Sequence, residues 1–223
     1  MLFQEGLELR EAGDNQEALA LMEQALDSGY DDVELLLELG ATRREVGDYF
    51  GAIDLLKEAT EREPNNFEAW YNLAEAYHNT GEDQYKDEAH WAMDHALELE
   101  PDNPDAHWLM GMIRYFQYNN PDEAIQDLSR AIELRPDYAL FYNVRGVIFL
   151  ETGQWEECVA DYNEFATLDP ANPYAYFERG LCYQGLGDGD RVRENFERFL
   201  DLSEGNPEFD QMRGEASRWL DEN

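Results

Sequence analysis

The chain has 223 residues, of which 43% are hydrophobic and 13% aromatic, a composition typical of a folded rather than a disordered protein. Asp and Glu number 51 against 16 Lys and Arg, so the formal net charge at pH 7 is −35. A surface of this sign repels the phosphates of nucleic acids and anionic membranes, and no apolar run is long enough to cross a bilayer. We therefore expect neither a nucleic-acid partner nor membrane insertion.

The strong acidity has two interpretations, and the sequence leaves both open. Hydrated carboxylates suit a surface adapted to concentrated salt, which screens their repulsion. They also form a docking field for a basic partner. The first residues, MLFQEGLELREAG, have neither the basic nor the apolar segment of an export signal, and we expect a cytoplasmic location.

Small residues recur along the chain at a nearly constant period. One series, taken as the small residue that ends each first helix, is separated by 34, 34, 37, 35 and 34 residues, and consists of Gly6, Gly40, Ala74, Gly111, Gly146 and Gly180. A second series, expected near the start of a second helix, shifts with it and consists of Ala18, Ala52, Ala89, Ala124, Cys158 and Val192. We expect the two series to face each other, Gly against Ala, where two antiparallel helices approach closely.

Helix-ending residues follow the same period. Glycines suited to a left-handed C-terminal position fall between the two helices at Gly13, Gly47, Gly81, Gly153 and Gly187. The fourth repeat has YNNPDEA there instead, where Asn119 or Asn120 can take that conformation and Pro121 can begin the next helix. A proline ends the second helix in four repeats, at Pro64, Pro101, Pro136 and Pro170.

These landmarks divide the chain into six repeats of two helices each, followed by one helix. In chain order the repeats are residues 1–32, 33–66, 67–103, 104–138, 139–172 and 173–206, and residues 207–223 form the last helix. The third repeat has three extra residues within GEDQYKDEAH, which predict a longer loop or an extra helical turn. The first repeat lacks the start of its first helix and its proline, as expected of an outer repeat.

The pattern closely resembles the tetratricopeptide repeat, in which Trp-x2-Leu-Gly-x2-Tyr, Ala-x3-Phe and Pro recur every 34 residues. The third repeat carries it as WYNLAEAY (residues 70–77), Ala89, Met93 and Pro101. The resemblance covers essentially the whole chain. It implies an all-α fold, a right-handed superhelical solenoid of six helix-turn-helix repeats with a C-terminal capping helix.

The family superhelix has a concave groove lined mainly by first helices, and the repeat register then implies which residues face it. The candidate binding residues, rich in aromatic side chains, are Leu37, Tyr71, Glu75, His78, Trp108, Met112, Tyr115, Phe116, Asn143, Tyr174 and Phe177. Rings and methionine beside carboxylates suit a basic or amphipathic peptide. Aromatic residues at helical spacing also serve as core, and that alternative stays open.

Other side chains are expected to be structural. The family resemblance implies that Arg145 pairs with Asp161, whereas Arg179 has Asn195 at the matching position and needs a partner from elsewhere. The histidines, His78, His90, His95 and His107, lack the spacing of metal ligands on one helix face. Two cysteines, Cys158 and Cys182, are too few for a disulfide scaffold, and we expect buried free thiols and a reducing compartment.

No catalytic motif or cofactor-binding loop is found, and acidic pairs carry no information in so acidic a chain. The sequence therefore predicts a non-enzymatic scaffold or adaptor that binds a peptide or partner protein and needs no cofactor or metal. Two alternatives remain. One is self-association through the apolar edge of the first helix. The other is that the chain, which begins inside a helix, is a docking module of a longer protein.

Overall fold

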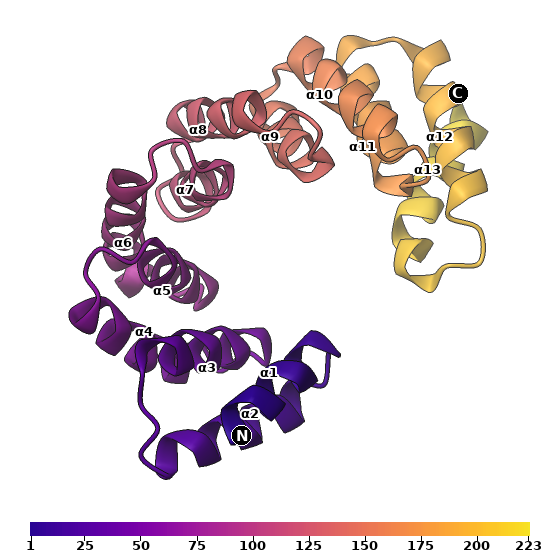
Figure 1. The fold of residues 1–223 in the computed structure, drawn as a ribbon. Coiled ribbons are helices and arrows are strands. Elements are labelled where there is room, and N and C mark those ends of the chain that lie inside the picture. The colour runs from indigo at the N-terminus through magenta and orange to yellow at the C-terminus, as the bar shows by residue number, and fades with distance from the viewer. The chain divides into compact units, whose positions relative to one another are not determined.

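The computed structural model describes residues 1–223 and consists of helices without a strand (Figure 1), which confirms the predicted all-α class. The helix bounds are α1 Leu2–Glu11, α2 Asn15–Asp27, α3 Val33–Glu45, α4 Tyr49–Arg62, α5 Phe67–Asn79, η1 Asp83–Tyr85, α6 Lys86–Leu99, α7 Pro104–Phe116, α8 Pro121–Leu134, α9 Ala139–Thr152, α10 Trp155–Leu168, α11 Pro173–Leu186, α12 Gly189–Leu202, η2 Pro207–Phe209 and α13 Asp210–Glu222. No helix combines the length and apolar character needed to cross a bilayer.

The helices group into two compact units, residues 1–119 (unit 1) and 120–223 (unit 2). In unit 1, α5 packs beside α3 and α7 to form one layer, and α4 and α6 form a second layer behind it (Figure 1). In unit 2, α9 contacts α11, and α13 packs on α12. Within each unit, neighbouring repeats pack against one another because a single helix pair cannot bury its apolar face alone.

The predicted turns between first and second helices are confirmed. Gly47 and Gly153 have φ angles of 86° and 75°, in the left-handed region that favours glycine. In the fourth repeat Asn119 takes this conformation with φ 50°, Asn120 caps the next helix, and Pro121 begins it. The insertion in the third repeat forms the short helix η1, which precedes α6.

The close approach of paired helices differs from the expected contact of Gly with Ala. A Cβ on Gly40 would lie 2.8 Å from Cγ of Leu56, and one on Gly146 would lie 2.9 Å from Cε2 of Tyr162. Each glycine therefore receives the large side chain one turn after the small residue of the second helix. The expectation was wrong because the side chain that crosses the gap is the large one, and the missing Cβ makes room for it.

Four of the turns from a second helix to the next first helix share a recurring side-chain hydrogen bond. The indole Nε1 of Trp70 donates to the carbonyl of Pro64 at 2.8 Å. The equivalent bonds join Nε2 of His107 to the oxygen of Pro101 at 2.9 Å, and the hydroxyls of Tyr142 and Tyr176 to the oxygens of Pro136 and Pro170, each at 3.1 Å. Thus the fourth residue of each of these first helices has a structural role.

The expected ion pair is present in unit 2. Arg145 donates from Nε and Nη2 to the two carboxylate oxygens of Asp161, at 2.8 and 2.6 Å, and from Nη1 to Ser129 at 2.8 Å. Arg179 donates from Nε to Oδ1 of Asn195 at 2.7 Å and from Nη1 to Oδ1 of Asn163 at 2.9 Å. The expected partner from elsewhere is therefore present as Asn163, but Asn195 is a partner as well, because an amide oxygen accepts the same hydrogen bond.

Cys158 of α10 and Cys182 of α11 form a disulfide, with their Cα atoms 5.9 Å apart, so the expectation of free thiols was wrong. Both side chains are fully buried. The sequence offered no sign of the pairing, since the residues lie 24 positions apart in different repeats. The bond joins the fifth repeat to the sixth, and the argument from free thiols to a reducing compartment no longer applies.

We predict that Asp161→Leu destabilises the protein by about 3–5 kcal/mol, because it leaves the Arg145 guanidinium half-buried without its carboxylate. Asp161→Asn should cost less, since the chain already pairs Arg179 with Asn195. Urea unfolding of both variants measures the difference. Equal losses in the two variants would contradict this account of the pair.

We also predict that reduction of the disulfide lowers the melting temperature. Closing a loop of this length stabilises a chain by roughly 3.5 kcal/mol in the chain-entropy description. Thermal unfolding monitored by circular dichroism with and without dithiothreitol tests this, and a Cys158→Ala/Cys182→Ala variant should melt like the reduced protein and ignore the reductant. A reductant effect that persists in the double variant would show another cause.

Candidate functional site

The first helices of unit 1 present a set of half-buried and exposed side chains that we call the first-helix face. Its members come from α3, α5 and α7, which lie side by side (Figure 1), and are Arg44, Tyr71, Glu75, His78, Trp108, Met112, Tyr115 and Phe116. Tyr71, Trp108 and Met112 pack on one side against the hydrophobic core of the unit.

Aromatic side chains run across the first-helix face. The rings of Phe67 and Tyr71 stack with centroids 5.7 Å apart on α5. On α7, Tyr115 meets Phe116 edge-on at 5.1 Å, and Phe116 lies 6.5 Å from the His78 ring of α5. Phe116 is 61% exposed, so this part of the face offers apolar surface to solvent.

Carboxylates surround these rings and outnumber the bases. Arg44 forms an ion pair with Glu75, and Arg10 of α1 forms ion pairs with Glu38 and Glu45. Burial raises the pKa of Glu75, and the nearby Glu45 and Asp105 add to the effect although Arg44 opposes it. Burial also raises the pKa of Glu68, where Glu38 adds to the effect and Arg10 opposes it. A cation placed here would relieve this repulsion.

A small pocket extends this acidic region toward the first repeat. It has a volume of about 240 Å³ and is lined by Leu7, Arg10, Glu11, Glu38 and Glu45. Sequence reasoning missed Arg10 and Arg44 as part of the site. The signal was available, because Arg10, Arg44 and His78 are each 34 residues apart and so share one register position.

Three polar atoms of the first-helix face have no hydrogen-bond partner. They are Nε of Arg44, Nε1 of Trp108 and Nδ1 of His78, and all three are buried from solvent. Burial lowers the pKa of His78, which favours the neutral imidazole. Buried polar atoms in folded proteins are nearly always paired, so these unpaired ones are exceptional.

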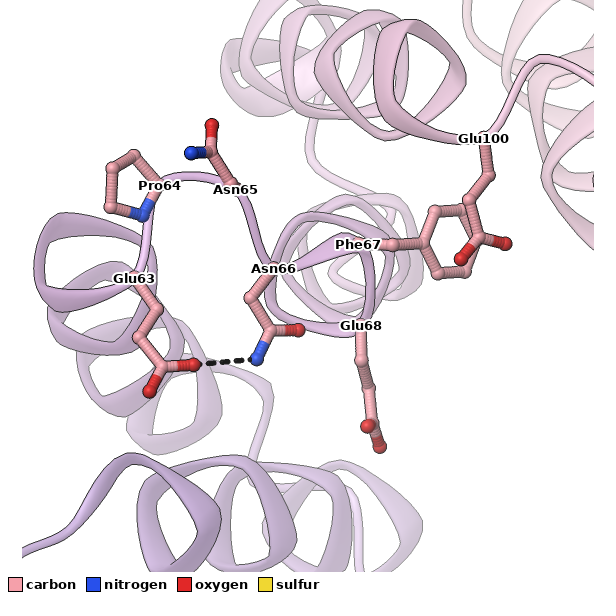
Figure 2. Close-up of a pocket in the computed structure, with 7 residues that line it drawn as sticks. All are labelled: Glu63, Pro64, Asn65, Asn66, Phe67, Glu68 and Glu100. Carbon is pink, nitrogen blue, oxygen red and sulfur yellow. Dashed lines mark hydrogen bonds between the residues drawn. The ribbon is translucent and has the colours of Figure 1, made fainter.

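A larger pocket, of about 710 Å³, lies at the turn between α4 and α5 (Figure 2). Figure 2 shows Asn66 donating to Glu63 across 2.9 Å and the Phe67 ring next to Glu100. The same asparagine caps α5. The pocket adjoins the first-helix face because Phe67 stacks on Tyr71.

The structure does not bring all eleven predicted residues into one exposed site. Leu37 and Phe177 are only 6% and 4% exposed, so they are core residues, and placing them on an accessible surface was wrong. Phe177 packs between Phe196 and Phe199 of the second helix of its own repeat. Asn143 and Tyr174 are half-buried in unit 2, apart from the first-helix face as we define it.

Three of the histidines have partners within the protein. Nδ1 of His90 lies 3.1 Å from Asp94, and His107 binds the Pro101 carbonyl. His95 packs against the ring of Trp70 with centroids 4.6 Å apart. These contacts assign each of the three to local packing.

Unit 2 contains a buried carboxyl group among other acids. Burial raises the pKa of Glu178 to about 7, and Glu215 of α13 and Glu151 of α9 raise it further. The hydroxyl of Tyr162 from α10 is buried and has no hydrogen-bond partner. Burial raises its pKa, and the charge of Glu178 raises it further. The protonation state of Glu178 therefore affects how α13 packs on this unit.

Family models match most of the chain. One described as TPR repeat matches residues 40–81, 114–153 and 146–187, and one described as tetratricopeptide repeat matches residues 3–42. Together the matches span residues 3–81 and 114–187, which is more than half of the sequence.

Known proteins with similar sequences are longer than this chain. The BBSome complex member bbs-4 of Caenorhabditis elegans is 25% identical over 205 residues, which cover 90% of this chain and 44% of that protein. The peroxisomal targeting signal receptor of Candida albicans is 25% identical over 224 residues, which cover 83% of this chain and 38% of that one. The chain thus spans less than half the length of either relative.

Among solved structures, a tetratricopeptide repeat protein from Parabacteroides merdae is similar with a TM-score of 0.75. The match covers 97% of this chain and 84% of that one at 20% sequence identity. At this identity the likeness concerns the fold alone.

We predict that unit 2 loses stability as the pH rises through about 7. Glu178 has a higher pKa in the folded protein than in the unfolded chain, so its contribution is complete below about pH 4.5 and is lost as the group ionises in the folded state. Glu178→Gln should therefore melt at a higher temperature than the wild type at pH 8 but not at pH 5. Exposed Glu194→Gln serves as the control, and parallel melting curves for wild type and Glu178→Gln across this range would contradict the prediction.

Proposed function

Because the chain belongs to the tetratricopeptide repeat family, whose members mediate protein–protein interaction, we propose that its first-helix face binds a segment of a partner protein. The segment is basic and amphipathic. The protein acts as a scaffold or adaptor without catalysis of its own, in keeping with a family of non-enzymatic interaction modules.

The observation that carries the proposal is the meeting of two features on one face. Half-buried rings at Tyr71 and Trp108 offer apolar area, and the acids around Glu75 exceed the bases. A basic segment with apolar side chains would complement both features.

Different side chains of the face contact different parts of the segment. Aromatic rings and the flexible Met112 bury the apolar side chains of the segment. The carboxylates near Glu68 and Glu75 attract Lys or Arg, accelerate association and select against acidic segments.

One relative supports the proposal that this chain recognises a segment of another protein. The Candida albicans protein is named a receptor for a peroxisomal targeting signal. The name applies to that protein. For this chain it supports only the kind of ligand that we propose, a segment of another polypeptide. The identity of the segment comes from the charge and shape of this chain's own face.

Self-association is the second candidate, favoured by an apolar pocket at the start of the chain. It has a volume of about 320 Å³, and its lining consists of Met1, Leu2, Phe3, Gln4, Ala25, Ser28 and Tyr30. Tyr30 is 42% exposed beside it. A second copy could cover this edge, although the net charge opposes association at low salt.

We predict that Tyr71→Ala/Trp108→Ala weakens peptide binding by roughly tenfold or more, because it removes the two central rings of the face. A displayed library of 12-residue random peptides is selected on the wild-type protein, and enriched peptides should combine Lys or Arg with apolar residues. Affinities of the synthetic peptides are then measured by fluorescence anisotropy.

Tyr138→Ala is the matched control, since Tyr138 is an exposed ring that precedes α9 in unit 2, outside the first-helix face. It should leave the affinity unchanged, and circular dichroism should show intact helicity in all variants. Full affinity in the folded double variant would place the binding site elsewhere. Loss of binding together with dimer dissociation in sedimentation experiments would favour self-association.

A further inference from the structure

The layer behind the first-helix face of unit 1 carries its own aromatic surface, which we call the outer aromatic strip. It consists of Phe50, Trp70, Tyr77, Tyr85 and Trp91. Phe50 of α4 and Trp91 of α6 are 52% and 53% exposed, although large aromatic side chains usually bury most of their area. Two half-exposed rings in the same unit call for an explanation beyond folding.

The rings of the strip form two contacting groups. The centroid of Phe50 lies 6.2 Å from that of Tyr85, and Tyr85 lies 5.5 Å from Tyr77. Trp91 packs edge-on against Trp70 at 5.0 Å. Trp70 and Tyr77 belong to α5 and are largely buried, but they point toward the second-helix layer, where they line one pocket with Trp91. This shared pocket connects the two groups.

The insertion in the third repeat builds part of this strip. Its extra residues form η1, which ends at Tyr85 and so places this ring between Phe50 of the second repeat and Tyr77 of the third. The other repeats join their two helices without a short helix of this kind. The departure from the 34-residue period therefore creates surface that a regular repeat lacks.

Trp91 separates two pockets of different chemistry. The pocket on one side has a volume of about 390 Å³, and its lining is mostly apolar: Lys57, Thr60, Glu61, Pro64, Trp70, Leu73, Tyr77 and Trp91. The pocket on the other side, of about 330 Å³, is lined by Gln84, Asp87, Glu88 and Trp91. One exposed ring thus forms a wall of both an apolar and an acidic pocket.

The charges around the strip are mainly negative. Lys57 is the base in the apolar pocket, and its ammonium group lies over the Tyr77 ring, 5.6 Å from the centroid. Lys86 is bound to Asp83 at 3.0 Å. In the acidic pocket Asp87 accepts a hydrogen bond from Tyr118, whereas Glu88 is exposed.

We propose that the outer aromatic strip is a second docking surface, for a short segment of a partner protein that pairs an apolar side chain with Lys or Arg. The apolar side chain enters the pocket lined by Trp70 and Tyr77. The cation lies on the Trp91 ring beside Glu88, where the face of an indole and a carboxylate attract it together. Exposed Trp flanked by pockets is typical of residues that dominate binding energy.

Charge complementarity selects this occupant over others. A second copy would bring the same acidic strip, or another part of a chain of net charge −35, against Asp87 and Glu88. Nucleic acids and anionic bilayers carry the same sign and are repelled as well. A segment with a base next to an apolar residue meets both pockets without repulsion.

The test uses the full chain with Tyr71→Ala/Trp108→Ala, so that the first-helix face cannot contribute. A displayed library of 12-residue random peptides is selected on this protein, and synthetic copies of the enriched peptides are the probes for fluorescence anisotropy. Enriched peptides should pair an apolar residue with Lys or Arg. Adding Trp91→Ala should weaken their binding roughly tenfold or more.

Glu88→Gln keeps the fold intact and tests the cationic half of the proposal. It should weaken binding several-fold and reduce the dependence of affinity on salt, whereas Glu17→Gln, an exposed carboxylate on α2, should do neither. Unchanged affinity in both Trp91→Ala and Glu88→Gln would overturn the proposal. So would enrichment of acidic peptides or the absence of any enrichment.

Sedimentation of the protein without peptide tests whether a second copy of the chain occupies the strip. The proposal expects the same mass with and without Trp91→Ala. A dimer that Trp91→Ala abolishes would assign the strip to a second copy and overturn the proposal. Because the two faces are disabled by different substitutions, the failure of one proposal leaves the result for the other unaffected.

Discussion

The contact of a glycine in one helix with a large side chain in its partner sets the spacing of the two layers. Leu56 lies against the space at Gly40, and Tyr162 against the space at Gly146. A Cβ at either glycine would push the second helix away, since the interior has no room to absorb the displacement. Every later feature of the structure, including both faces of unit 1, depends on helices held at this distance.

The tight packing of layers divides the side chains of α5 between two surfaces. Tyr71 and Glu75 belong to the first-helix face, whereas Trp70 and Tyr77 turn toward the second-helix layer. One helix therefore supports both proposed docking surfaces. Both combine aromatic area with an excess of carboxylates, so both proposals predict a preference for cationic, partly apolar segments over acidic ones.

At these surfaces the acidic side chains bear on the proposed binding as well as on solubility. A high net charge by itself favours solubility in salt as well as a basic partner. Burial raises the pKa values of Glu75 on the first-helix face and of Glu68 beside it, although Arg44 and Arg10 oppose the effect, so the protein compensates their charge only in part. A bound cationic partner would compensate the charge of these buried carboxylates. Hydration, which suffices for exposed carboxylates, does not.

The sequence by itself determined the helical class, the two-helix repeat and the turns, because periodicity and glycine or proline positions act through local backbone preferences. It also identified most of the first-helix face, since register alone decides which side of a helix a residue occupies. Only the tertiary structure decided which of those residues are accessible: Leu37 and Phe177 share the register but are covered by neighbouring helices. The disulfide between Cys158 and Cys182 and the strip around Trp91 likewise arise from contacts between repeats. Such contacts depend on distances across the layers, which a local sequence pattern does not contain.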